Sequence, residues 1–187
     1  MKRDFATRLL NLVSMAMLIR LLFGAAHSGA LIRLNPLKTF GFSMSAIWAL
    51  AFALIYFGTH FLWAHRGRWM SELIFVGGLG TIGWLIDGYW NTTEVLRFYG
   101  PYQWAPLWLL LIWCGVVATF RSGLEPFFRK PATAAVTGLI LGPMIEGFAI
   151  HQGLIGVPNG IVNFVMVIGL TWALLFGAAT YLMKWAR

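Results

Sequence analysis

The chain has 187 residues, of which 59% are hydrophobic, 16% are aromatic and only 11% are charged, and its mean hydropathy is +0.75. This composition excludes an ordinary soluble domain and is typical of a polytopic membrane protein. The net charge of +8 does not indicate nucleic-acid binding, because the basic residues cluster beside apolar segments instead of along one polar face. A span needs roughly 20 mainly apolar residues, so we expect about six spans in a single domain over residues 1–187.

In chain order, the first apolar segment follows a basic start and is interrupted by Arg20 and His27. A cleavable signal peptide is an alternative interpretation of this segment, but Arg20 would break its apolar core. A basic turn separates the second segment from the third, and Pro106 opens the fourth at a position where a missing N–H costs nothing. We therefore predict an all-α transmembrane bundle whose spans cover about residues 9–32, 43–63, 70–90, 106–120, 132–151 and 161–183.

The distribution of Lys and Arg predicts the orientation of this bundle. If the N-terminus is inside, most of the basic residues flank the inner ends of the spans, from Lys2 and Arg3 at the start to Lys184 and Arg187 at the end. The positive-inside rule therefore predicts that both termini are cytoplasmic. The outside loops then hold Arg33, Lys38 and Arg97.

Ionisable residues inside apolar spans are costly, so each of them should face a partner or a cavity. Arg20 and Glu146, in the first and fifth spans, fall at comparable depths, and we expect them to form an ion pair. Asp87, His27 and His151 lie near the outer ends of their spans. These residues predict a polar site in the outer half of the bundle, between spans one, three and five.

Small residues indicate which faces of the third and fifth spans pack against other helices. Each stripe of small residues includes one of the two carboxyl groups, so both carboxyls are expected at helix–helix contacts. The third-span stripe comprises Gly80, Gly83 and Asp87, and the fifth-span stripe comprises Gly138, Gly142, Glu146, Ala149 and Gly153.

The same residues also have purely structural interpretations. In the structural interpretation, an ion pair between Arg20 and Glu146 fixes the helix register and has no other role. In the same interpretation, Asp87 simply caps a helix end. No predicted helix carries a His pair at ligand spacing, so we expect neither a metal nor another cofactor. The remaining histidines, His60 and His65, are expected at the inner interface.

From Gly77 onward, the sequence contains in order GGLGTIGWLIDG, LRFYG, APLWLLLIW, a basic turn, GLILGP and IGVP. This order resembles an uncharacterised family of small bacterial inner-membrane proteins, a domain of unknown function. The resemblance extends to Asp87, Pro106, Trp108 and the Gly142–Pro143 step, and it fails at Glu146, where the family usually has an aromatic residue. It implies the fold, the topology and a bacterial inner-membrane location, and it implies no activity.

The function that we predict is a membrane enzyme acting on a lipid or isoprenoid. A carboxyl group in an apolar pocket can keep its proton near neutral pH and so can donate or accept one. On this hypothesis Asp87 or Glu146 is the acid or base, His27 or His151 relays the proton, and Arg20 sets the charge of the carboxylate. The expected pocket lining is Trp84, Trp113 and Phe148.

Two other functional classes fit the same residues. In a small-solute or proton-coupled transporter, polar residues must continue to the inner face, where His60 and Thr119 are the few candidates. In a non-catalytic assembly subunit, the glycine faces would hold a membrane-protein partner or a second copy of the chain. The bilayer is the environment expected in every case, and no nucleic-acid partner is expected.

Overall fold

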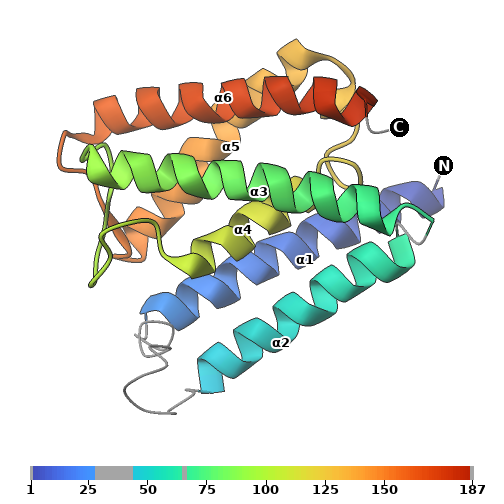
Figure 1. The fold of residues 1–187 in the computed structure, drawn as a ribbon, viewed down its shortest axis with the longest axis horizontal. Coiled ribbons are helices and arrows are strands. Elements are labelled where there is room, and N and C mark those ends of the chain that lie inside the picture. Colours follow the sequence, from blue (N-terminus) through green and yellow to red (C-terminus); the bar gives the residue numbers. More distant parts are fainter. Residues whose placement is uncertain (1, 28–43, 65–66, 186–187) are drawn as a thin grey trace.

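A computed structural model describes residues 2–27, 44–64 and 67–185 of the protein. In these ranges the chain is an all-α bundle with one short two-stranded ribbon (Figure 1). Its elements are α1 (Lys2–His27), α2 (Met44–Gly58), a π-helical turn η1 (Thr59–Ala64), α3 (Trp69–Thr92), β1 (Arg97–Phe98), α4 (Leu107–Ala118), a 3₁₀ turn η2 (Phe127–Arg129), α5 (Pro131–His151), β2 (Ile155–Gly156) and α6 (Ile161–Trp185).

Within the described residues, four helices are long and apolar enough to cross a membrane. They are Phe5–His27 in α1, the whole of α3 and α5, and Ile161–Met183 in α6. The protein is therefore a multi-pass membrane protein, and the predicted all-α bundle is confirmed. Four of the six predicted spans are therefore confirmed as helices of sufficient length. The other two predicted spans correspond to shorter apolar helices, Ile47–Leu62 and α4.

The short helix α4 lies between α1 and α3 and forms the centre of the bundle (Figure 1). At a rise of about 1.5 Å per residue it extends only ~18 Å, less than the ~30 Å hydrocarbon core. It ends at Ala118 because the chain turns there, where the Thr119 hydroxyl donates to the carbonyl oxygen of Val116 at 2.6 Å. Trp108 and Trp113 on α4 are 7% and 3% exposed, so other helices surround α4.

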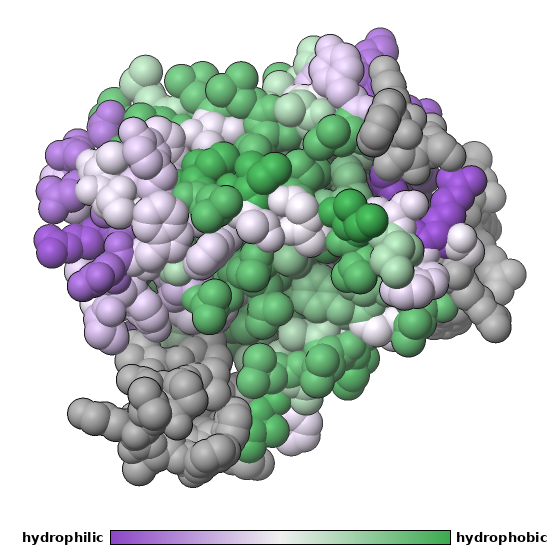
Figure 2. Space-filling view, in the orientation of Figure 1, coloured by the Kyte–Doolittle hydropathy of each residue, from purple (hydrophilic) through white to green (hydrophobic). Residues whose placement is uncertain are grey.

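The outer surface of the bundle suits a lipid environment. Large apolar side chains such as Leu54, Leu107 and Leu174 are 76%, 72% and 74% exposed. Figure 2 shows apolar residues across the middle of the face in view, with hydrophilic residues gathered toward its two ends. This arrangement is typical of a helical bundle in a bilayer.

The two ends of the bundle are fastened in different ways. At the end that we call the ribbon end, β1 pairs antiparallel with β2, and the Nδ1 of His27 lies 2.7 Å from the carbonyl oxygen of Gln152. At the opposite, terminal end, where α1 begins and α6 ends, Arg8 donates to the Glu125 carboxylate at 2.6 Å (Figure 1). The helices α1, α3 and α5 therefore run in the same direction, as the sequence predicted.

The predicted glycine faces are the faces on which the helices meet. A Cβ at Gly80 of α3 would lie 2.6 Å from the Sγ of Cys114 on α4. A Cβ at Gly138 of α5 would overlap the main chain of Trp172 on α6. Gly153 is the exception, because it lies beyond the end of α5 in a left-handed conformation, with φ of 67°, that favours glycine.

Candidate functional site

The structure brings Asp87 of α3 and Glu146 of α5 together. Each residue is 1% exposed, and the two carboxyl groups are near enough to interact electrostatically. The indole Nε1–H of Trp113 on α4 donates to Oδ2 of Asp87 at 2.6 Å. In the part of the chain that the structure describes, Oε2 of Glu146 is buried without a hydrogen-bond partner. Two predicted site residues thus form one cluster, which we call the carboxyl pair, and their chemical role stays a prediction.

Arg20 is not part of the carboxyl pair. The residue is exposed, and across the described ranges no ion pair joins it to Glu146. The predicted ion pair is therefore wrong. The reason is that α1 packs against α2 and α4, so the face of α1 that carries Arg20 is turned toward the surface.

The two histidines predicted as proton relays lie at the ribbon end. Both His27 and His151 are exposed. His27 contacts the main chain of Gln152, the residue after His151, so the ends of α1 and α5 meet there. A relay role for either histidine stays a prediction.

The three aromatic residues predicted to line a pocket have different contacts. Trp113 holds Asp87 and packs on Trp172, with ring centroids 4.4 Å apart. Trp84 donates its indole N–H at 3.1 Å to the carbonyl oxygens of Ala105 and Pro106, and so ties α3 to the start of α4. Phe148 packs elsewhere, because its ring stacks on that of Phe23.

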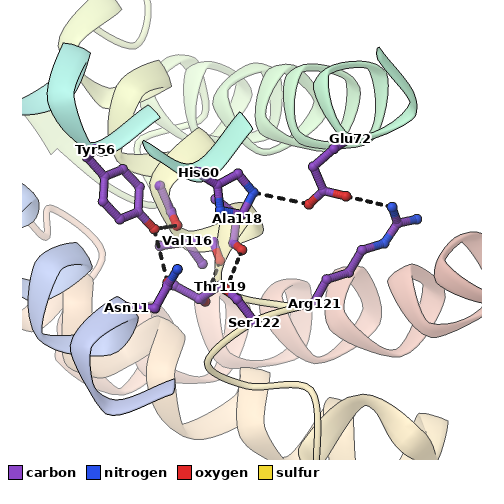
Figure 3. A network of polar contacts seen from close by, with 10 residues as sticks. Asn11, Tyr56, His60, Glu72, Val116, Ala118, Thr119, Arg121 and Ser122 are labelled. Atoms are coloured by element: carbon purple, nitrogen blue, oxygen red, sulfur yellow. Dashed lines mark hydrogen bonds and ion pairs between the residues drawn. The ribbon is translucent and has the colours of Figure 1, made fainter. Parts of the chain in front are cut away.

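A second buried cluster lies at the terminal end, and the sequence did not reveal it (Figure 3). Glu72, in the first turn of α3, is 0% exposed. Its Oε1 lies 3.2 Å from Nε2 of His60, and its Oε2 accepts a hydrogen bond from Arg121 at 2.6 Å. The Arg121 guanidinium also lies over the ring of Phe75, 4.2 Å from its centroid. We call His60, Glu72 and Arg121 the His–Glu–Arg cluster.

Local structure brings these three residues together. His60 lies in η1, the π-helical turn that continues α2, and such turns are frequent at functional sites. A short connection leads from η1 to α3, so His60 and Glu72 meet across a helical hairpin. Arg121 follows the end of α4, which packs along α3. The signal that the sequence did offer is an acidic residue near the start of a span, because an ionisable group at such a position needs a partner; the sequence does not say which residue that partner is.

Tyr56 connects the His–Glu–Arg cluster to the neighbouring helices (Figure 3). It lies one turn before His60, and the two rings stack with centroids 6.4 Å apart. Its hydroxyl lies 3.3 Å from Oδ1 of Asn11 on α1 and 3.3 Å from the carbonyl oxygen of Gly115 on α4. The tyrosine therefore joins α1, α2 and α4 at the depth of the cluster.

A groove of about 280 Å³ runs between α1 and α2 and ends at His60. Leu10 and Ile55 on its rim are 66% and 63% exposed, so its mouth opens among side chains that face the lipid. Phe52 supplies a further apolar wall. The polar lining residues are Thr7, Asn11, Ser14, Tyr56, Thr59 and His60.

Packed aromatic rings, which we call the aromatic layer, lie along α4 between Trp113, which binds Asp87, and Phe120, which precedes Arg121. Trp172 packs on Trp113, and its ring centroid lies 5.4 Å from that of Phe176. Phe176 in turn meets Phe120 at 4.6 Å. The space among Trp113, Phe120 and Phe176 is about 10 Å³, hardly enough for one water molecule. The two polar clusters are therefore separate sites.

The fold and the two sites define a class: a multi-pass α-helical membrane protein with buried ionisable groups in both halves of its bundle. The chain belongs to the family described as "Protein of unknown function (DUF2878)", whose model matches residues 37–178. This match confirms the resemblance found in the sequence. Comparison with curated proteins and comparison with solved structures find no match. The geometry of the sites is therefore the basis for proposing a function.

Proposed function

We propose that this protein is an integral-membrane enzyme that acts on the uncharged polar head of a lipid-like amphiphile, with His60 and Glu72 as its acid–base pair. One observation carries the proposal. The groove between α1 and α2 opens among lipid-facing side chains and ends at a histidine that a buried carboxylate holds. Ligand pockets commonly combine apolar walls with a few polar groups that converge on one point.

The His–Glu–Arg cluster has the parts of a general acid–base site. In such sites an imidazole takes or gives a proton at the substrate, and a second group orients the imidazole. Glu72 would orient the ring of His60. Arg121 supplies the positive charge that a buried carboxylate needs. Removing a general base typically costs about 10²–10⁴ in rate.

The groove favours an uncharged head group. Its polar lining consists of hydroxyl, amide, phenol and imidazole groups, which bind alcohols and carbonyls. A phosphate would call for Arg or Lys. No Arg or Lys is among the described residues that line the groove, and Arg8 and Arg121 each already donate to a carboxylate at 2.6 Å. A volume of about 280 Å³ accommodates a head group, while the hydrocarbon chain stays in the bilayer. A long-chain or isoprenoid alcohol is therefore the substrate class that we propose.

The aromatic layer favours this function over transport. A transporter needs a polar route between the two faces of the membrane. Buried ionisable groups do lie in both halves, but packed rings of Trp113, Phe120 and Phe176 leave only about 10 Å³ of space among them. From the Lys and Arg distribution we also propose that both termini are cytoplasmic and that the membrane is the bacterial inner membrane. On that orientation the groove opens to the cytoplasmic leaflet, whereas the sequence had suggested a site in the outer half.

Filling the groove should abolish ligand binding. The protein in lipid nanodiscs is irradiated with a long-chain alcohol that carries a diazirine, and labelled peptides are identified by mass spectrometry. We expect labelling on α1 and α2 of the wild type, and at least about a tenfold loss in Ser14→Trp, which fills the groove. Val13→Trp, at a neighbouring position that is 54% exposed, is the matched control and should keep the label. Equal labelling of both variants would remove the groove as the binding site.

Losing His60 should abolish turnover. Membrane lipids are compared by mass spectrometry between cells that produce no protein, the wild type, His60→Gln or His151→Gln at equal protein levels. We expect one lipid class to change with the wild type and with His151→Gln, and to stay at the level of the empty cells with His60→Gln. If His151→Gln alone loses the change, catalysis belongs to the ribbon end and the carboxyl pair. Identical lipids in all four strains would contradict an enzymatic function.

A further inference from the structure

The carboxyl pair is not used by the function proposed above, and its geometry suggests a role of its own. We infer that Asp87 and Glu146 form a proton-binding site, in which the two carboxyl groups hold one exchangeable proton that resides on Glu146. The site lies between α3 and α5, in the half of the bundle that ends at the ribbon, and it is separate from the groove.

Burial and charge require at least one proton at this site. Asp87 and Glu146 are each 1% exposed. Over the ranges that the structure describes, neither carboxyl is in an ion pair with Lys, Arg or His. A single unpaired carboxylate in apolar surroundings is already costly. Two carboxylates within interaction distance of each other also repel, so such pairs ionise one at a time.

The surroundings of the two carboxyl groups assign the negative charge to Asp87. Trp113 donates to Oδ2 of Asp87 at 2.6 Å, shorter than a usual N–H···O bond, and short hydrogen bonds are typical of ionised acceptors. The indole is fixed in place, because its ring packs on Trp172 and against the bare backbone of Gly83. Glu146 has no such donor at Oε2. The proton therefore stabilises Glu146, and the indole N–H stabilises Asp87.

Among the residues that the structure describes, no ion pair or side-chain hydrogen bond brings another charged group to the carboxyl pair. From α3, the charged group that acts on Glu146 is Asp87 itself. The helices α4 and α6 contribute the neutral rings of Trp113 and Trp172. On α1, Arg20 is exposed. Glu146 lies five residues before the exposed end of α5, about 7.5 Å along the helix axis, so water at the ribbon end is the near source of protons.

Infrared spectroscopy of the protein in nanodiscs tests this assignment, because a carboxylic acid and a carboxylate absorb at different frequencies. We expect the wild type to show an acid C=O band that shifts when H₂O is replaced by D₂O. Glu146→Gln should lose this band, whereas Asp87→Asn should keep it and lose a carboxylate band. The exposed Glu94, outside both sites, gives the matched control Glu94→Gln, which should keep the acid band.

Several outcomes would overturn the inference. The opposite pattern, in which Asp87→Asn loses the acid band, would place the proton on Asp87. An acid band that does not shift in D₂O would show a proton that does not exchange. Removal of the band by NaCl at constant pH, with KCl as the ionic-strength control, would show that the site binds Na⁺ instead. Asparagine and glutamine are close in shape to the acids they replace, so we expect both variants to fold. The helical circular dichroism of each variant separates loss of folding from loss of the band.

Discussion

Replacing Glu72 with alanine is expected to lower the free energy of unfolding by about 3–5 kcal/mol, the range typical for breaking a buried ion pair. The side chain of Glu72 is 0% exposed and that of Arg121 is 13% exposed, so neither charge is well solvated. Glu72→Ala leaves the guanidinium without its carboxylate. In the described part of the chain, the second terminal nitrogen of Arg121 is already buried without a hydrogen-bond partner. Water therefore does not readily replace the hydrogen bond that the Glu72 carboxylate provides.

Reversible unfolding in mixed micelles measures this effect, with Glu94→Ala as the control for losing an exposed acid. The control should change the free energy of unfolding by less than about 0.5 kcal/mol. The double variant Glu72→Leu with Arg121→Met should recover most of the lost stability, because replacing a buried ion pair by apolar residues of similar volume is often neutral or stabilising. A Glu72→Ala protein as stable as the wild type would show that the ion pair between Glu72 and Arg121 does not contribute to the free energy of unfolding.

The sequence was sufficient for features that depend on local pattern. Apolar runs located the helices, and the spacing of glycines identified the contact faces of α3 and α5, including Gly80 and Gly138. Both signals work because a side chain's place on a helix follows directly from its place in the chain. The direction of α1, α3 and α5 followed from simple alternation of the predicted spans.

The error at Arg20 has a geometric cause. Counting residues along a helix gives the depth of a side chain, and Arg20 and Glu146 were matched by depth. The direction in which each side chain points around its helix depends on which helices are neighbours. The helix α1 packs on α2 and α4, so Arg20 is exposed while Glu146 is buried against Asp87.

The His–Glu–Arg cluster was missed for a related reason. Its residues come from three elements, with Arg121 separated from Glu72 by 49 positions. Arg121 is one of the basic residues at the inner ends of the predicted spans, which the sequence analysis interpreted together as topology signals, and His60 was expected at the inner interface. What distinguishes them is burial against Glu72, and burial results from tertiary packing that a single sequence does not encode in a local pattern.

A single added methyl group should have opposite effects at two glycines of α5, and this contrast is the sharpest test of the packing between α5 and α6. Gly138→Ala places a Cβ against the main-chain carbonyl of Trp172, whereas the Cβ that Gly147→Ala adds meets no atom of another element within 4 Å. A backbone carbonyl cannot rotate away as a side chain would, so the helices must separate, and overpacking of this kind typically costs about 1–3 kcal/mol or more.

Gly147→Ala is the matched control, because alanine is favoured over glycine in a helix interior by about 0.5–1 kcal/mol. We therefore expect the free energy of unfolding in mixed micelles to fall for Gly138→Ala and to rise slightly for Gly147→Ala. The comparison removes helix propensity as an explanation, since both variants gain the same preference on the same helix. If the two substitutions change stability in the same direction and by similar amounts, α6 does not contact α5 through Gly138, and Glu146, two turns further along the same face, loses the packing that buries it.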